Sequence, residues 1–171
     1  MELRVPESAL VLLIGPSGSG KSRFARRHFR ATEVLSSDAC RAMICDDEND
    51  QSVTRQAFEL LHFILRRRLR AGRLTVVDAT NVQAMAREPL LQIASRHRCP
   101  AVAIVFDLPE SLCRERDRQR RGRRVGPEVI RKQMAEMHAG LAALGNEGFD
   151  HVFRLASAED VAAATVVRGA P

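Results

Sequence analysis

Long hydrophobic runs are absent from this sequence of 171 residues, and none approaches the roughly 20 residues that a membrane-spanning helix needs. The best candidate near the start, Ala9 to Ile14, is too short for the core of a signal peptide and lacks a cleavage site of small residues. We therefore expect a cytoplasmic protein that is neither secreted nor inserted into a membrane.

Cysteine is also scarce. Cys40, Cys45, Cys99 and Cys113 are scattered along the chain, with no CxxC pair and no cysteine–histidine spacing that suits zinc. A disulfide framework is typical of smaller secreted chains. We therefore expect four reduced thiols and no structural metal site.

Lysine is nearly missing, because 25 of the 27 basic residues are arginine. A compositional bias explains most of these arginines, but it also makes Lys21 stand out. A position that needs a compact ammonium rather than a flat guanidinium would keep lysine in such a chain. The net charge of +6 favours an anionic partner, either a nucleotide or a nucleic acid.

Short apolar runs alternate with amphipathic stretches along the whole chain. Five runs are predicted strands, at residues 9–14, 33–35, 74–78, 101–106 and 151–155. Helices are predicted after the glycine-rich turn up to about residue 29, after the second strand with Ser37 or Asp38 as the cap, and at residues 52–71, 85–96, 109–119, 129–144 and 157–164. Strands that are apolar on both faces and alternate with helices indicate a parallel five-stranded sheet covered by helices on both faces. We expect one doubly wound α/β domain over residues 1–171.

The sequence GPSGSGKS fits the phosphate-loop pattern GxxxxGK[ST] at every position, and it joins an apolar strand to a helix. Its glycines let backbone N–H groups turn toward phosphates, and the helix N-terminus adds its dipole. We expect Lys21 to reach phosphate oxygens and the Ser22 hydroxyl to bind Mg²⁺. The predicted nucleotide-binding residues of this loop are Gly15, Ser17, Gly18, Ser19, Gly20, Lys21 and Ser22.

A first polar cluster, SSDACR, follows the second predicted strand. Asp38 and Arg41 are three residues apart, so they share one face of the helix predicted there. A kinase needs a carboxylate to accept the proton of the attacking hydroxyl and a cation to hold the acceptor. The spacing fits equally well a helix cap at Ser37 or Asp38 with a local ion pair to Arg41, so both interpretations stay open.

A second polar cluster, Asp78 to Asn81, follows the third predicted strand. An apolar strand that ends in aspartate is typical of a Walker B carboxylate, which holds Mg²⁺ or its waters. Aspartate and asparagine are also ordinary turn residues. The phosphate loop elsewhere in the chain favours the first interpretation.

A third cluster consists of seven arginines: Arg114, Arg116, Arg118, Arg120, Arg121, Arg123 and Arg124. Arg116, Arg120 and Arg123 would line one face if the helix continued that far. Arginines that close over a nucleotide neutralise the charge of a phosphoryl group in transfer. Some of the seven fit a merely solvated face, as does the run Arg66 to Arg70.

Together these segments resemble the kinase module of bacterial polynucleotide kinase-phosphatase enzymes of RNA repair, and more distantly the phage polynucleotide kinases. The resemblance runs essentially end to end. It is carried by LIGPSGSGKS, EVLSSDACR, DDENDQSVT, LTVVDATNV, VFDLPESLCRERDRQRRGRRV and VIRKQ. The phosphate loop is shared by a very large class, whereas the Asp38–Arg41 pair, the DDENDQ loop and the lid arginines are far more specific.

The resemblance implies a P-loop NTPase fold with a helical arginine lid, and transfer of the ATP γ-phosphate to the 5′-hydroxyl of RNA or DNA. It makes Asp38 the general base and Arg41 the residue that grips the phosphate on the 3′ side of the acceptor nucleotide. Ser22 and Asp38 are implied to approach the Mg²⁺ ion. The family's kinase is usually joined to a phosphatase and a ligase-like domain, so the resemblance implies an isolated module of a longer protein.

The resemblance also assigns the remaining site residues. Arg116, Arg120 and Arg123 match the lid, and together with Lys21 the first two are the expected catalytic cations. Gln51, Asp78 and Asn81 match positions expected to contact the acceptor.

Two other functions stay open. A small-metabolite or nucleoside kinase on the same fold would use Asp38 in the same way, but it needs no phosphate-gripping cation outside the ATP site. A nucleotide-dependent binding module would bind ATP without transferring phosphate, and it would leave Asp38 unexplained.

Overall fold

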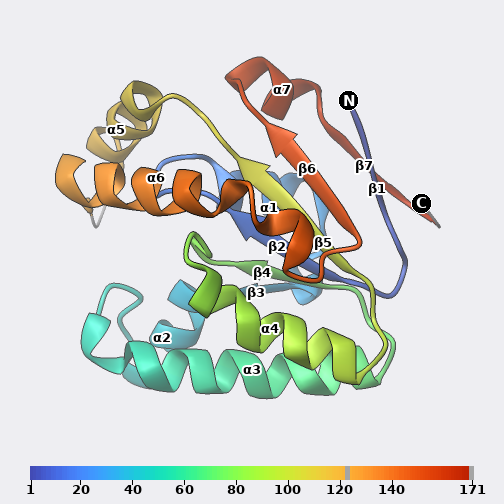
Figure 1. Ribbon diagram of the computed structural model, residues 1–171. Helices are drawn as coiled ribbons and strands as arrows, with labels where there is room; N and C mark the ends of the chain where they lie inside the picture. The colour runs from blue at the N-terminus through green and yellow to red at the C-terminus, as the bar shows by residue number, and fades with distance from the viewer. Residues whose placement is uncertain (122–123, 170–171) are drawn as a thin grey trace.

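Five parallel strands form the main sheet of the computed structural model, which describes residues 1–121 and 124–169 (Figure 1). In spatial order they are β3 (Val34–Ser36), β4 (Thr75–Asp78), β2 (Leu10–Ile14), β5 (Ala101–Phe106) and β6 (His151–Leu155). All neighbouring pairs are parallel, so the predicted five-stranded sheet is confirmed. The pairing places Ser36 and Leu13 opposite Asp78, which brings three strand ends to one edge.

Helices cover both faces of this sheet. They are α1 (Lys21–His28), α2 (Ser37–Cys45), α3 (Thr54–Arg70), α4 (Ala84–Arg96), α5 (Glu110–Arg118), α6 (Pro127–Leu141) and α7 (Ala158–Ala163). Short 3₁₀ turns lie at Ala31–Glu33, Gln51–Val53 and Leu144–Asn146. No helix in the described part of the chain is both long enough and apolar enough to cross a bilayer.

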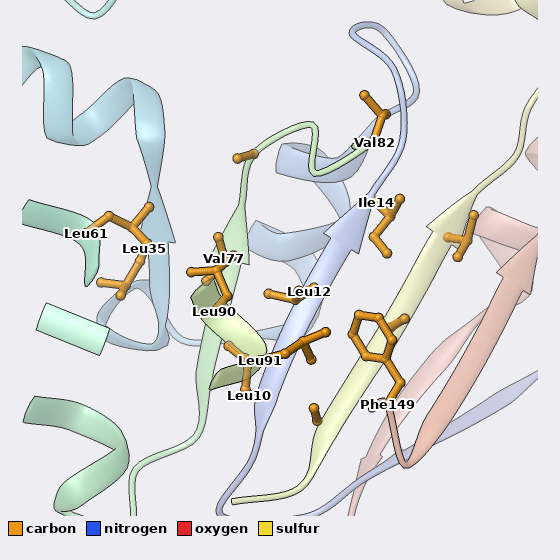
Figure 2. Packing of buried hydrophobic residues seen from close by; sticks show 14 of the residues in the cluster. Leu10, Leu12, Ile14, Leu35, Leu61, Val77, Val82, Leu90, Leu91 and Phe149 are labelled. Atoms are coloured by element: carbon orange, nitrogen blue, oxygen red, sulfur yellow. The ribbon is translucent and has the colours of Figure 1, made fainter. Parts of the chain in front are cut away.

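The two faces of β2 pack into two hydrophobic cores, because successive side chains of a strand point to opposite sides. Leu10, Leu12 and Ile14 pack with apolar residues of α3, α4 and α6. Figure 2 shows the three side chains along β2, with Leu90 of α4 near Leu10 and Leu12. Val11 and Leu13 belong to the second core, which includes apolar residues of α1. This fully buried strand leads directly into the phosphate loop and therefore gives that loop a rigid base.

A separate two-stranded sheet was not predicted. β1 (Glu2–Val5) pairs in parallel with β7 (Thr165–Arg168), so two segments from opposite ends of the described chain lie side by side (Figure 1). Leu3 and Val5 are completely buried in the second core, the one that includes apolar residues of α1. Each strand has only four residues, and the pairing spans nearly the whole chain, so neither segment gave a recognisable local pattern.

The predicted cap of α2, Ser37 or Asp38, was wrong by one or two positions. Ser36 is the capping residue, and its hydroxyl accepts a hydrogen bond from the backbone N–H of Ala39 at 3.3 Å. Neither Ser37 nor Asp38 caps the helix, since both lie in its first turn. The Asp38 carboxylate is therefore not committed to capping the helix.

Candidate functional site

A cleft of about 510 Å³ lies where the carboxyl ends of β2, β3 and β4 meet the lid helices α5 and α6. This is the edge at which parallel α/β sheets bind ligands. The predicted residues that line it are Ser17, Gly18, Gly20, Lys21, Ser22, Asp38, Arg41, Gln51, Asp78, Arg116 and Arg120. Gly15 and Ser19 belong to the same loop but are buried beneath its surface. Arg123 lies outside the described residues.

The phosphate loop packs so closely against α5 that one position accepts only glycine. Gly18 has φ of +80°, and a Cβ added there would lie 2.2 Å from the carbonyl oxygen of Cys113. Gly20 also has a positive φ, of +96°. Side chains at either position would strain the backbone. The glycines therefore allow the conformation of the loop, and α5 packs directly against it.

Lys21 is held inside this loop. Its ammonium donates hydrogen bonds to the carbonyl oxygens of Gly15 at 2.7 Å and Pro16 at 2.8 Å, and the residue is only 7% exposed. Burial lowers the pKa of Lys21 to about 8, against the opposing effect of the nearby Asp78 carboxylate. A desolvated ammonium of this kind gains strongly from an anionic ligand.

Asp78 and Ser22 supply oxygen donors beside Lys21. Burial raises the pKa of Asp78, although a hydrogen bond from Ser22 and the charge of Lys21 oppose that effect. Among residues 1–121 and 124–169, no group of three or more His, Cys, Asp and Glu side chains could hold a metal ion. Mg²⁺ commonly takes one or two carboxylates together with waters and phosphates. Ser22, Asp78 and the nearby Asp38 fit that requirement.

Asp38 and Arg41 form an ion pair across the first turns of α2. Nη1 of Arg41 lies 2.5 Å from Oδ1 of Asp38, and Nε donates to the Thr54 hydroxyl at 3.3 Å. The Arg41 side chain is 8% exposed, whereas that of Asp38 is 54% exposed. A nearly buried arginine therefore orients a carboxylate that stays accessible from the cleft.

The arginine lid is a helix end followed by a loop. Arg116 lies on α5 and donates to the carbonyl oxygen of Ser19 at 3.4 Å, but α5 ends at Arg118. Arg120 therefore lies beyond the helix, and the predicted common helical face does not form. The buried carboxylate of Asp117 accepts hydrogen bonds from the N–H groups of Val125 and Gly126, which turns the chain back toward α6. Arg120 and Arg121, both members of the arginine cluster of the sequence, line the cleft from this loop.

Asn81 and Gln51 occupy different kinds of position. Asn81 is 3% exposed, has φ of +50° and donates from its amide to the carbonyl oxygen of Leu13 at 2.8 Å. This hydrogen bond links the end of β4 to β2, and Asn81 does not line the cleft. The contact of Asn81 with an acceptor stays a prediction. Gln51 lies exposed at the rim, where its amide donates to the carbonyl oxygen of Asn49.

Sequence reasoning missed Gln133, which comes from α6. Its Oε1 accepts a hydrogen bond from the backbone N–H of Ser17 at 2.8 Å, so a lid helix directly holds the phosphate loop. A single glutamine on an amphipathic helix carries no pattern, although VIRKQ ends on this residue. Thr54, which supports Arg41, was missed for the same reason.

Replacing Gln133 with alanine is expected to weaken ATP binding about fivefold, since one hydrogen bond worth about 1 kcal/mol no longer fixes the loop. Isothermal titration calorimetry with ATP and Mg²⁺ measures this effect. Gln92→Ala on α4 is the matched control, because that glutamine is exposed and its amide contacts Glu88. Equal affinities in the two variants would contradict a role for Gln133.

Solved structures with a similar fold come from several kinds of protein. A chain of the Pnkp1/Rnl/Hen1 RNA repair complex has a TM-score of 0.70 at 20% identity, over 82% of this chain and 47% of that chain. A chain of the AvrRxo1-ORF1:-ORF2 structure with ATP has a TM-score of 0.69 at 13% identity, over 90% and 56%. A gluconokinase from Sinorhizobium meliloti 1021 has a TM-score of 0.59 at 17% identity, over 92% and 87%. At these identities the likeness shows the fold alone.

The present chain spans about half the length of the repair-complex chain that it matches. A search of curated proteins found no match. A family model described as an AAA domain matches residues 10–144, which cover the phosphate loop, Asp38, Asp78 and the described part of the lid. The protein therefore belongs to this AAA-domain family and has the fold of a P-loop kinase.

Proposed function

We propose that the protein is a kinase that uses ATP and Mg²⁺ to phosphorylate the 5′-hydroxyl end of RNA or DNA. The observation that carries the proposal is the Asp38–Arg41 pair, which lies in the same cleft as Lys21 and Ser22. Membership of the family implies ATP binding. The resemblance of the SSDACR segment to polynucleotide kinases supports the identity of the acceptor.

The donor side of the cleft would bind the triphosphate. The loop amides and Lys21 hold its oxygens, and Arg116 and Arg120 reach the same phosphates from the lid. Ser22 and Asp78 would hold Mg²⁺, with Asp38 contacting only the water shell of the ion, and the ion would supply neutralisation of the phosphate charge. Since Lys21 is already desolvated, it offers a fixed positive charge at low reorganisation cost.

The acceptor side would activate the hydroxyl. Asp38 takes the proton of the 5′-hydroxyl as its oxygen forms a bond to the γ-phosphorus, while the bond from that phosphorus to the β,γ-bridging oxygen breaks. Arg41 keeps the carboxylate in place through its ion pair and binds the phosphate on the 3′ side of the acceptor nucleotide. The products are ADP and a 5′-phosphorylated strand.

A small-metabolite kinase is the second candidate, favoured by the similarity to a gluconokinase over 87% of that chain's length. Such an enzyme needs the donor side and Asp38 but has no use for a phosphate grip beside the acceptor hydroxyl. We also propose that the full-length protein joins this module to phosphatase and ligase-like domains, since the matched repair-complex chain is about twice as long.

A transfer assay with γ-labelled ATP and Mg²⁺ tests the proposal, using a 5′-hydroxyl oligonucleotide and its 5′-phosphorylated twin as acceptors. We expect label on the hydroxyl oligonucleotide alone, and RNA and DNA versions then define the preferred acceptor. If neither oligonucleotide is labelled although ATP binds, the polynucleotide assignment is wrong. Small hydroxyl acceptors, beginning with gluconate, are then the compounds to examine.

A further inference from the structure

Helix α1 carries arginines on one face as it leaves the cleft. Arg23, Arg26 and Arg27 have i, i+3 and i+4 spacing, and Arg30 follows just beyond the helix. These four residues, here called the α1 arginine surface, are exposed, whereas Phe24 and Ala25 on the opposite face are buried in the core. From Arg23 to Arg27 the helical rise amounts to about 6 Å, about two phosphate spacings along one duplex strand.

The four guanidinium groups of this surface form no ion pair within the described protein. Helix α1 contains no acidic residue, and no carboxylate among the described residues lies within 4.0 Å of these groups. Nη1 of Arg27 donates to the carbonyl oxygen of Ala162 at 3.4 Å, and the backbone N–H of Arg30 donates to the Glu33 carboxylate at 2.9 Å. Arg26 and Arg27 lie in the last turn, where the helix dipole favours a cation. Arg23 lies in the first turn, where the dipole disfavours one. Arg23 therefore gains from any anionic ligand bound in the cleft that it lines.

The α1 arginine surface is continuous with the acceptor side of the cleft. Arg23 lines the cleft together with Asp38 and Arg41. Arg26, one turn further along, is close enough to Asp78 to lower the pKa of that carboxyl against the larger effect of burial. An acceptor whose hydroxyl lies at Asp38 thus has this basic surface directly beside it.

The rim formed by the loop before α3 has the opposite charge. Asp46, Asp47, Glu48 and Asp50 follow one another closely there, and Glu48 and Asn49 line the cleft. A polyanion would be repelled by these carboxylates and attracted by the arginines of α1. The charges of the acidic loop and of the α1 arginine surface therefore favour a phosphodiester chain that leaves the cleft along α1.

We infer that the α1 arginine surface binds the phosphodiester backbone of the acceptor strand beyond its terminal nucleotide. This rests on the proposed function, and it makes α1 the element that distinguishes a polynucleotide from a mononucleotide acceptor. The contacts are to phosphates, so they carry no base sequence preference.

The double variant Arg27→Gln/Arg30→Gln tests this surface without altering Arg23, which lines the cleft, or Arg26, which lies near Asp78. We expect the KM for a 5′-hydroxyl 20-mer to rise about five- to tenfold, and the slope of log KM against log salt to fall by about 1 to 2. The KM for a nucleoside 3′-monophosphate, which has no further phosphates, should change less than twofold.

Arg66→Gln/Arg70→Gln on α3 is the matched control, since it removes the same charge from an exposed helix face away from the cleft. Equal effects of the two double variants on the 20-mer, or no effect of the α1 variant while the wild type labels the 20-mer, would overturn the inference alone. Failure of the wild type to label any oligonucleotide would overturn the proposed function, and this inference with it. Thermal unfolding of each variant checks that the fold is kept.

Discussion

Replacing Asp38 with asparagine is expected to lower kcat for phosphate transfer by about 10²- to 10⁴-fold, the usual contribution of a general base. Asparagine has nearly the same shape and keeps an oxygen that accepts the hydrogen bond from Arg41, now found at 2.5 Å. The amide cannot take a proton from the acceptor hydroxyl. Asp38 is neither a helix cap nor part of the phosphate loop, so ATP affinity should stay within about threefold of the wild type. That change is smaller than the loss of one hydrogen bond to a charged group would cause.

Single-turnover transfer and ATP calorimetry separate these two effects. Asp46→Asn, just beyond the C-terminal end of the same helix, is the matched control, because Asp46 is exposed and has φ of +58°, a conformation that asparagine tolerates well. The control should transfer phosphate at the wild-type rate. A near-normal kcat in Asp38→Asn would remove Asp38 from the role of base and leave the ion pair with Arg41 as a structural feature.

The sheet and the phosphate loop could be predicted because their signals are local and repeated. β2 and β5 are apolar on both faces, and each predicted strand is followed by a turn and a helix. The loop pattern is continuous over eight residues, Gly15 to Ser22, and each position has a defined role in phosphate binding. Local propensity, burial and motif spacing therefore indicated the same structure.

Features that depend on distant partners could not be predicted. Asp117 helps to end α5, because its carboxylate accepts hydrogen bonds from backbone N–H groups eight and nine residues further along the chain. Gln133 holds Ser17 across 116 positions of the chain. Asn81 was predicted to contact a ligand, but its amide donates to a backbone carbonyl of the protein itself. An asparagine after a strand has the same sequence pattern in both cases. Spacing identified Asp38 and Arg41 as a pair, but only the structure shows which of them is exposed.

Lys21→Ala is expected to reduce kcat/KM for ATP by about 10²- to 10³-fold, the effect of removing one preorganised donor from a transition-state site. The cost is large because the ammonium is already desolvated and positioned by the carbonyls of Gly15 and Pro16. Lys21→Arg should restore little of the loss, since a planar guanidinium does not fit a site built around a compact ammonium. Full activity of Lys21→Arg in the transfer assay would contradict this account of the loop.

The pH dependence of ATP affinity tests the same lysine in the unaltered protein. With a pKa of about 8, Lys21 is charged below that pH and loses its proton above it. A bound polyphosphate favours the charged form, so binding near this pH takes up a proton and affinity must fall as the pH rises. From pH 7 to pH 9 we expect the ATP Kd to increase about tenfold, by the fraction of Lys21 that remains protonated. Burial raises the pKa of the nearby Cys113 thiol, so its ionisation does not explain a loss in this range. The dependence should vanish in Lys21→Ala, and a Kd that stays constant between pH 7 and pH 9 in the wild type would show that the ammonium does not contact the phosphates.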